Sequence, residues 1–460
     1  MRSIDTLATK TGMELSLAFR TGSTTPTLVT ELFLDKIERA KSDSIFITVT
    51  ADRALAEARA ADLRYKTGSP LSLLDGVPVA WKDLFDITGT VTTAGSRVSE
   101  RRIVSSKDSV SVFNLCAAGL VTLGKVNTSE FAYSGLGINS NFGTPRNPHD
   151  RLSLRSPGGS SSGSGAAVAA GLTTCAIGTD TGGSIRIPAA FNGVVGFKTS
   201  TGKIDKNGVV PLSRTLDTVG PLARSVEDCV LLYCYLQGVA VPMIKRRRLT
   251  DLVVVSPTNI VLEGAEHAVA ENYEASLKAL EDNGVTVRRE NVSALDQILE
   301  MTAEHGNLVA AEAYAEYRAL IEGPEVDLID RRVVQRMLGG KKMTANDVLT
   351  IQRKRRCLEA EVRTQLQGAL LVMPTSPLTA PEVAPLEAND ELFHTINQKT
   401  LRNASFGNVL DLCAVAMPNG RNHAGLPTSF LLSACHGDDE NLLSYALEVE
   451  RVFKTCGLST

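Results

Sequence analysis

Apolar positions in the N-terminal third of the chain recur with a helical period. Pro26 begins a predicted helix that runs to about Lys41, since proline at the first helical position loses no hydrogen bond. A second predicted helix has apolar residues at i, i+3, i+4 and i+7 and ends at Gly68. Its apolar positions are Ala51, Ala54, Leu55, Ala58, Ala61 and Tyr65. The mainly apolar residues 74–80 then predict a buried strand.

The same alternation of helix and strand continues along the chain. Residues 165–171 and 266–283 have helical patterns, residues 173–178 are typical of a buried strand, and residues 285–289 and 370–374 are typical of strands. Alternation of this kind favours an α/β fold, with a mixed, mostly parallel central sheet covered by helices on both faces. Because no linker, composition shift or repeat divides the sequence, we expect residues 1–460 to form a single large α/β/α domain.

Composition and charge exclude several classes of protein. The chain of 460 residues has 48 Lys and Arg against 51 Asp and Glu, a net charge of -3, so bulk charge does not hold it on nucleic acid. Its 43% apolar residues are typical of a globular protein. No apolar run approaches the roughly 18 residues of a membrane helix. Residues 1–12 do not resemble a signal peptide. We therefore expect a cytoplasmic protein without nucleic-acid or membrane partners.

The cysteines and histidines predict no metal site. The eight cysteines form no C-x-x-C pair, and the six histidines show no H-x-x-x-H spacing. Their neighbours are small or apolar, so we expect all eight to be reduced thiols packed in the core. They are Cys116, Cys175, Cys229, Cys234, Cys357, Cys413, Cys435 and Cys456.

Two basic runs, residues 245–248 and 353–356, interrupt this near-neutral chain. Neither contains interleaved aromatic residues, so we interpret both as solvated surface. The second run lies on a predicted helix that Thr344 can cap.

Two stretches rich in glycine and serine, residues 156–165 and 178–188, have compositions that packing alone does not explain. A flexible linker is one interpretation of the first, but it leads directly into a small-residue helix and a buried strand. No Gly-Lys-Ser/Thr follows, which excludes a phosphate-binding P-loop. In the second stretch, the amides of Gly182 and Gly183 can turn toward one point beside the Ser184 hydroxyl. Donors next to a hydroxyl are typical of an acyl-transfer site.

A nucleophilic serine needs a base, and the sequence offers two arrangements. Residues 159–163 match the nucleophile-elbow pattern G-x-S-x-G, with Ser161 as nucleophile and a histidine as base, but the polar residues 151–156 do not form the strand that an elbow requires. The other candidate base is Lys82, which follows an apolar strand beside Trp81. Burial there would lower its pKa, although the fragment by itself is also typical of a surface lysine.

Three ordered motifs add a resemblance. GVPVAWKD (residues 76–83), GGSSSGS (158–164) and GTDTGGSIRIPAAF (178–191) resemble those of the amidase signature family of serine hydrolases. The similarity is strong over about residues 10–235. It implies a signature core at about residues 70–235 and a variable, substrate-specifying part at about 236–460.

The resemblance also implies a catalytic group. Ser184 would be the nucleophile, Ser160 a bridging serine next to a cis peptide bond, and Lys82 the base, a Ser-cisSer-Lys triad. The oxyanion would bind to amides of Thr181, Gly182, Gly183 and Ser184. Asp180 and Arg186 would hold this turn, and Tyr133, Ser134 and Gly135 would border the acyl pocket.

The implied activity is that of an amidohydrolase without metal or organic cofactor. It would cleave the C–N bond of a small amide, with primary amides, aryl amides, urea-like amides and carbamates all left open. The chain departs from common members of the family at four positions that are not catalytic. They are Ser162, Asn192, Thr199 and Lys203.

Alternative functions remain. One is the ammonia-donating, glutaminase-type component (the A chain) of a tRNA-dependent amidotransferase, which needs partner chains. Such components usually carry a tyrosine-rich run, whereas residues 343–366 contain no tyrosine. A binding protein that has lost catalysis is another. Since two-fold dimers are the commonest soluble assembly, a homodimer is the expected state.

Overall fold

The computed structural model describes residues 6–98, 103–150, 152–239 and 244–458. Its centre is an 11-stranded sheet with the order β1-β3-β2-β4-β6-β5-β10-β11-β9-β7-β8. The strands are β1 (Phe46–Val49), β2 (Pro78–Lys82), β3 (Val121–Val126), β4 (Cys175–Asp180), β5 (Val195–Lys198), β6 (Thr218–Ala223), β7 (Val253–Pro257), β8 (Thr286–Glu290), β9 (Leu370–Pro374), β10 (Cys413–Arg421) and β11 (Pro427–Ala434).

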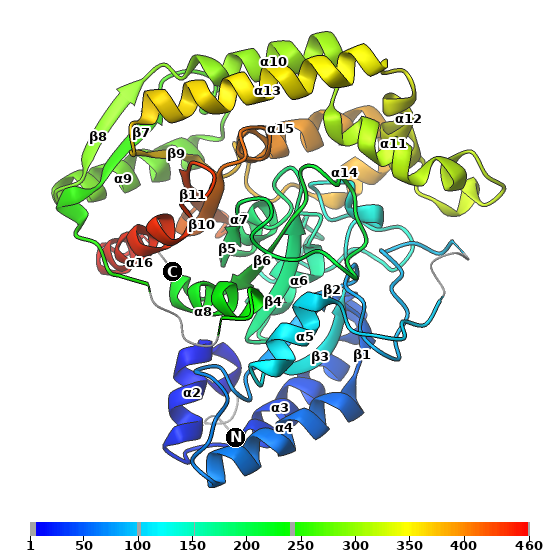
Figure 1. Cartoon of the computed structure of the whole chain (residues 1–460), viewed down its shortest axis with the longest axis vertical. Helices are drawn as coiled ribbons and strands as arrows, with labels where there is room; N and C mark the ends of the chain where they lie inside the picture. Colours follow the sequence, from blue (N-terminus) through cyan, green and yellow to red (C-terminus); the bar gives the residue numbers. More distant parts are fainter. Residues whose placement is uncertain (1–5, 99–102, 151, 240–243, 459–460) are drawn as a thin grey trace.

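Helices cover the sheet on both faces (Figure 1). Those of the first half are α2 (Gly12–Arg20), α3 (Pro26–Arg39), α4 (Ala51–Lys66), α5 (Val110–Ala117), α6 (Ser162–Ala169), α7 (Arg186–Asn192) and α8 (Val226–Leu236). Those of the second half are α9 (His267–Asp282), α10 (Ser293–His305), α11 (Leu308–Ile321), α12 (Arg331–Lys341), α13 (Ala345–Leu366), α14 (Val383–Ala388), α15 (Asp390–Val409) and α16 (Asp439–Thr455).

The sheet is mixed. Strand β2 is parallel to β3 and β4, and β7 is parallel to β8 and β9. The strands between these two parallel groups pair in antiparallel fashion, from β4 through β6, β5, β10 and β11 to β9. Helices connect the parallel strands, as such crossovers require. The predicted single α/β domain with a mixed sheet covered by helices is confirmed. Of the strand pairings in the described structure, four are parallel and six are antiparallel, so the parallel share is smaller than the alternation of helix and strand predicted.

Most predicted elements begin and end within a few residues of the observed ones. Helix α3 begins at Pro26, where the Thr25 side chain caps the Leu28 amide at 3.2 Å. The strand predicted at residues 74–80 instead covers Pro78–Lys82, because Gly76 with φ +77° closes a turn before it. Helix α6 begins three residues before the predicted start, at Ser162, inside the serine-rich stretch.

The expectation that all eight cysteines pack in the core is wrong for four of them. Cys357 and Cys456 are exposed, and Cys116 and Cys435 are half-buried. Cys357 lies on the solvent side of α13 and Cys456 follows the end of α16, where the local sequence does not report which side faces water. All eight are free thiols, as expected.

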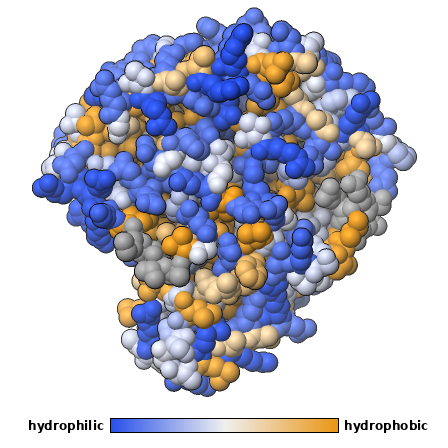
Figure 2. Space-filling model, in the orientation of Figure 1, coloured by the Kyte–Doolittle hydropathy of each residue, from blue (hydrophilic) through white to orange (hydrophobic). Residues whose placement is uncertain are grey.

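The face that Figure 2 shows is mostly hydrophilic, with small apolar patches between the polar residues. The basic run at 245–248 is exposed, as predicted, whereas the second run is not uniformly so. Its Arg355 turns inward, and its Nε donates to the carbonyl of Val409 at 2.6 Å. In the described part of the chain, no helix is both long and apolar enough to cross a membrane.

Candidate active site

Lys82 is the last residue of β2 and is fully buried. Its Nζ lies 2.7 Å from Ser160 Oγ and 2.8 Å from Thr179 Oγ1. Burial lowers the pKa of Lys82 to about 7, although the charges of Asp217 and Asp180 act to raise it. A neutral amine within hydrogen-bond distance of a hydroxyl can take its proton, so the geometry suits a general base.

The loop that carries Ser160 is rigid rather than a flexible linker. The Gly159–Ser160 peptide bond is cis, as the resemblance implied. A Cβ on Gly159 would lie 2.5 Å from the amide nitrogen of Gly137, so only glycine fits there. The Gly159 amide donates to the carbonyl of Gly135 at 2.7 Å, and the Ser129 amide donates to that of Ser160 at 3.1 Å.

Ser184 lies in the turn between β4 and α7 and is 5% exposed. The Ser161 amide donates to the Ser184 carbonyl at 3.1 Å, which ties this turn to the Ser160 loop. The structure therefore brings Lys82, Ser160 and Ser184 to one place from three separate segments of the chain. Ser184 borders a cavity, whereas Lys82 and Ser160 are fully buried behind it.

A buried ion pair holds the turn before Ser184. Asp180 accepts hydrogen bonds from Nε and Nη2 of Arg186, at 3.0 and 2.9 Å. It also accepts the amides of Gly183 at 2.8 Å and Ile185 at 3.0 Å. Burial alone would raise the pKa of Asp180, but Arg186 outweighs it, so the net pKa lies below the ordinary range. The carboxylate thus stays charged and fixes the turn.

The four amides named for the oxyanion differ in their partners. The Gly183 N–H donates to Asp180, so in this conformation it points away from the cavity. The amides of Thr181, Gly182 and Ser184 have no hydrogen-bond partner among the residues that the structure describes. A Cβ on Gly182 would project into open space. These three amides, rather than Gly183, are free to bind an oxyanion.

The cavity beside Ser184 has a volume of about 810 Å³. Tyr133, Ser134, Gly135, Thr181 and Gly182 line it together with Ser184, so the predicted acyl-pocket and oxyanion residues meet there. Apolar side chains form one wall, among them Leu212, Leu216, Ile298, Met301 and Leu308. A polar wall, formed by the polar lining residues, comes from α12, α13 and α15.

Two residues of this polar wall were not predicted from the sequence. Asn397 Oδ1 accepts the Gly135 amide at 2.8 Å and the Ser134 hydroxyl at 3.2 Å, which fixes the loop beside Ser160. Arg336 packs over the Tyr133 ring at 4.2 Å and donates to the Tyr133 carbonyl at 2.7 Å. Asn397 lies in an unremarkable helical sequence, so no signal could have indicated it.

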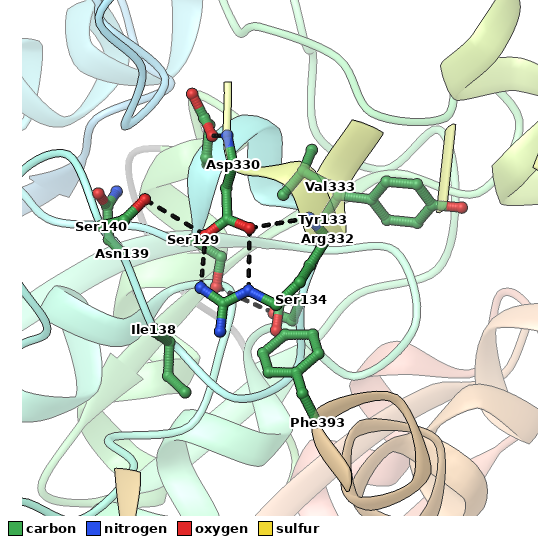
Figure 3. Close-up of a pocket in the computed structure, with 11 residues that line it drawn as sticks. Ser129, Tyr133, Ser134, Ile138, Asn139, Ser140, Asp330, Arg332, Val333 and Phe393 are labelled. Atoms are coloured by element: carbon green, nitrogen blue, oxygen red, sulfur yellow. Dashed lines mark hydrogen bonds and ion pairs between the residues drawn. The ribbon is translucent and has the colours of Figure 1, made fainter. Parts of the chain in front are cut away.

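A second, very small pocket lies beside the start of α12 (Figure 3). Arg332 and Asp330 face each other there through two hydrogen bonds, from Nε at 2.9 Å and Nη2 at 2.5 Å. The Arg332 guanidinium lies 4.5 Å from the centroid of the Phe393 ring. With a volume of about 10 Å³, this pocket holds about one water molecule and no substrate. The described residues contain no cluster of three or more metal-ligating side chains.

Comparison with known proteins identifies the family. The model of the Amidase family matches residues 28–443. The chain is 32% identical over 405 residues to a 2-amino-5-chloromuconic acid deaminase of Comamonas testosteroni, and the match covers 86% of each chain. It is 48% identical over 206 residues to the A component of the glutamyl-tRNA(Gln) amidotransferase of Cupriavidus necator, which covers 45% of this chain and 40% of that one.

A crystal structure of an amidase has the same fold. It matches with a TM-score of 0.85 at 28% identity, covering 98% of this chain and all of the other. The chain therefore belongs to the amidase signature family, whose members are hydrolases that act on carbon–nitrogen bonds.

Proposed function

We propose that this chain hydrolyses the C–N bond of a small amide through an acyl-Ser184 intermediate. The observation that carries the proposal is the 2.7 Å contact between Lys82 Nζ and Ser160 Oγ, in a buried position that lowers the pKa of the lysine. The hydrogen bond from the Ser161 amide to the Ser184 carbonyl holds Ser184, at the edge of a cavity, close to Lys82 and Ser160. The same serine lies beside three unpartnered amides.

The chemistry follows from these positions. Neutral Lys82 accepts a proton from Ser160, which accepts one from Ser184, and Ser184 Oγ attacks the amide carbonyl carbon. Amides of Thr181, Gly182 and Ser184 stabilise the oxyanion. The C–N bond breaks as the relay returns the proton to the leaving nitrogen. Water then loses a proton to the relay and attacks the ester, which releases the acid and restores the Ser184 hydroxyl.

We propose that substrate specificity resides in the part of the chain after about residue 236. Apart from Leu212 and Leu216, the far walls of the cavity come from residues 298–310 and 336–409. Primary amides, aryl amides, urea-like amides and carbamates are all candidate substrates, and the proposed enzyme needs no cofactor. The related deaminase from Comamonas testosteroni also removes nitrogen from a small organic acid, as its name states.

A component of a tRNA-dependent amidotransferase is the second candidate. The amidotransferase relatives are similar over less than half of the chain. The deaminase match instead extends over 86% of the chain. This difference favours a hydrolase that acts without partner chains.

The elbow alternative with Ser161 has less support. Ser161 Oγ donates to the carbonyl of Thr179 at 3.2 Å and accepts the amide of the same residue at 3.3 Å. Both contacts point this hydroxyl into the protein, toward β4. Moreover, Ser161 immediately precedes α6, with no strand of the sheet ending before it.

Single substitutions test the proposed group. We expect Ser184→Ala to abolish amide hydrolysis, and Lys82→Ala and Ser160→Ala to lower kcat/KM by at least about 10²-fold, the usual effect of losing a general base. Ammonia release from an amide panel measures this, with circular dichroism as the control for folding. Ser161→Ala is the matched control, since its hydroxyl contacts only the Thr179 backbone, and it should keep most of the activity. Full activity of Ser184→Ala would overturn the proposal.

A further inference from the structure

Cations, but no carboxylates, line the cavity beside Ser184. Among the residues described, its charged lining consists of Arg336, Arg355, Lys399 and Arg402, and no Asp or Glu contributes to it. An enclosed site with one sign of charge attracts ligands of the opposite sign. A ligand can bind only to a cation whose hydrogen-bond donors are not already used by the protein.

Two of the four cations are already held by the protein. Arg355 donates to the Val409 carbonyl and pairs with Glu359 at 3.1 Å. Arg402 donates to the carbonyls of Glu263 and Val261, at 2.9 and 3.3 Å, and to the side chain of Asn403 at 3.2 Å. Their guanidinium groups therefore position α13 and α15 rather than a ligand.

Lys399 forms no ion pair among the described residues, but it ends in a single ammonium group, which lacks the planar pair of donors that matches a carboxylate. Arg336 has such a planar group and also has unused donors. Its one hydrogen bond in the described structure runs from Nη1 to the Tyr133 carbonyl, and its guanidinium stacks on the Tyr133 ring. A guanidinium carries five N–H donors, so most remain free. Arg332, one turn earlier on α12, offers an internal comparison because Asp330 neutralises it through two bonds (Figure 3). Arg336 has no such carboxylate among the described residues.

The Arg336 side chain is half-buried, with no carboxylate in contact among the described residues. Burial lowers the pKa of Arg336, although a guanidinium remains charged at any physiological pH. A desolvated charge needs a partner, and a planar guanidinium binds a carboxylate through two parallel hydrogen bonds. Tyr133, on which it stacks, borders the place where the acyl part of the substrate is proposed to lie.

We propose that Arg336 binds a carboxylate on the acyl part of the substrate, so that the enzyme hydrolyses monoamides of dicarboxylic acids. This inference rests on the proposed function. The reaction consumes one water, breaks the amide C–N bond and yields a dicarboxylate and ammonia. Arg336 is thus a specificity-determining residue that touches the end of the substrate distant from the reacting carbonyl.

Pairs of substrates that differ only in this charge provide the test. Succinamate, glutaramate and adipamate are compared with butyramide, pentanamide and hexanamide, in which a methyl group replaces the carboxylate. We expect kcat/KM to favour the charged amide by about tenfold to hundredfold for at least one pair, the range of a hydrogen bond to a charged group. Equal or lower values for all three charged amides would overturn the inference.

Substitutions of Arg336 test whether this residue causes the preference for charged amides. Arg336→Gln keeps an amide donor near the Tyr133 carbonyl, so we expect it to raise KM for the charged amide far more than for the neutral one, while Arg336→Lys partly restores binding of the charged amide. Arg353→Gln is the matched control, since it removes an exposed charge of α13 that does not line the cavity. An equal effect of Arg336→Gln on charged and neutral amides would contradict specificity for a carboxylate.

A measurement on the unaltered protein separates the two proposals. A fluorophosphonate reagent labels an activated serine, and we expect succinate, glutarate or adipate to slow labelling of Ser184 where butyrate does not. Labelling that all four acids leave unchanged overturns the carboxylate site but not the hydrolase. Absence of labelling together with absence of turnover on every amide overturns the proposed function itself.

Discussion

At the scale of single residues, the proposed mechanism depends on the protonation state of Lys82. Its ammonium would be fully buried with two hydroxyls as its hydrogen-bond partners and no carboxylate in contact. Burial therefore favours the neutral amine and lowers the pKa to about 7. The surface lysine that the sequence fragment also allowed would have kept an ordinary pKa. The three-dimensional packing of β2 and β4, rather than the motif alone, gives Lys82 the lowered pKa that the proposed base requires.

The lowered pKa predicts a dependence of activity on pH. Only neutral Lys82 accepts a proton, and the neutral fraction falls tenfold per unit below its pKa. We expect kcat/KM to decline below about pH 7 and to be about a hundredfold lower at pH 5. A pH–rate profile on a neutral amide measures this without titrating the substrate. A flat profile from pH 8 to 5 would contradict the role of Lys82.

The same shift predicts a change in stability. The folded-state pKa of Lys82 lies below that of the unfolded chain, so between about pH 7 and pH 10.5 the unfolded state binds more protons. This group therefore makes the free energy of unfolding rise with pH across that window. Urea unfolding of wild type and Lys82→Met at pH 7 and 9.5 isolates the contribution. We expect the advantage of the methionine variant to shrink at pH 9.5, and a constant difference would contradict the shift.

At the scale of elements, α15 fixes the loop beside Ser160. Asn397 accepts two hydrogen bonds from the loop, and a Cβ on Gly135 would lie 2.6 Å from Leu401 of the same helix. The loop then contacts Gly159 through its carbonyl at 135. The position of the Ser160 loop thus depends on a helix more than 200 residues later in the chain.

Replacing Asn397 tests this dependence. Asn397→Ala leaves the Gly135 amide and Ser134 hydroxyl without their acceptor in a buried place, so we expect a loss of about 1–3 kcal/mol of stability and a lower kcat. Urea unfolding and steady-state kinetics measure the two effects. Glu391→Ala, at an exposed site on the same helix, is the control for stability. Unchanged stability and kcat in Asn397→Ala would show that the loop does not need this helix.

The sequence predicts elements where a local pattern decides them. Helix α3 begins where Thr25 and Pro26 indicate, because capping is a local interaction. The start of the apolar strand was less predictable, since Gly76 adopts a left-handed conformation that the apolar pattern does not reveal. Arg355 was predicted on the surface, but its Nε donates to the carbonyl of Val409 at the end of α15, and its side chain lines the cavity.

At the scale of the whole molecule, the two halves of the chain contribute different parts of the site. The first half supplies the residues near Ser184, and ordered motifs made these predictable from the sequence. The second half supplies the far walls of the cavity through α10 to α13 and α15. Tertiary packing alone creates these walls, so neither the cavity nor the free guanidinium of Arg336 could be predicted.

Expression of the chain alone tests whether the proposed enzyme needs partner chains. We expect the purified chain to hydrolyse small amides, because its similarity to the deaminase extends over 86% of the chain, whereas its similarity to the amidotransferase component covers 45%. Ammonia release by the purified chain measures this, and light scattering gives its oligomeric state, for which we propose a homodimer. Turnover only after addition of the partner chains of an amidotransferase would favour the second candidate function.

The identity of the serine that a fluorophosphonate labels tests the proposed catalytic group most directly. The protein is treated with a fluorophosphonate, digested and mapped by mass spectrometry, in parallel with Ser184→Ala and Lys82→Ala. We predict one adduct, on Ser184, that is absent in Ser184→Ala and forms at least about 10²-fold more slowly in Lys82→Ala. An adduct on Ser161, or labelling of Lys82→Ala at the wild-type rate, would contradict the proposed catalytic group.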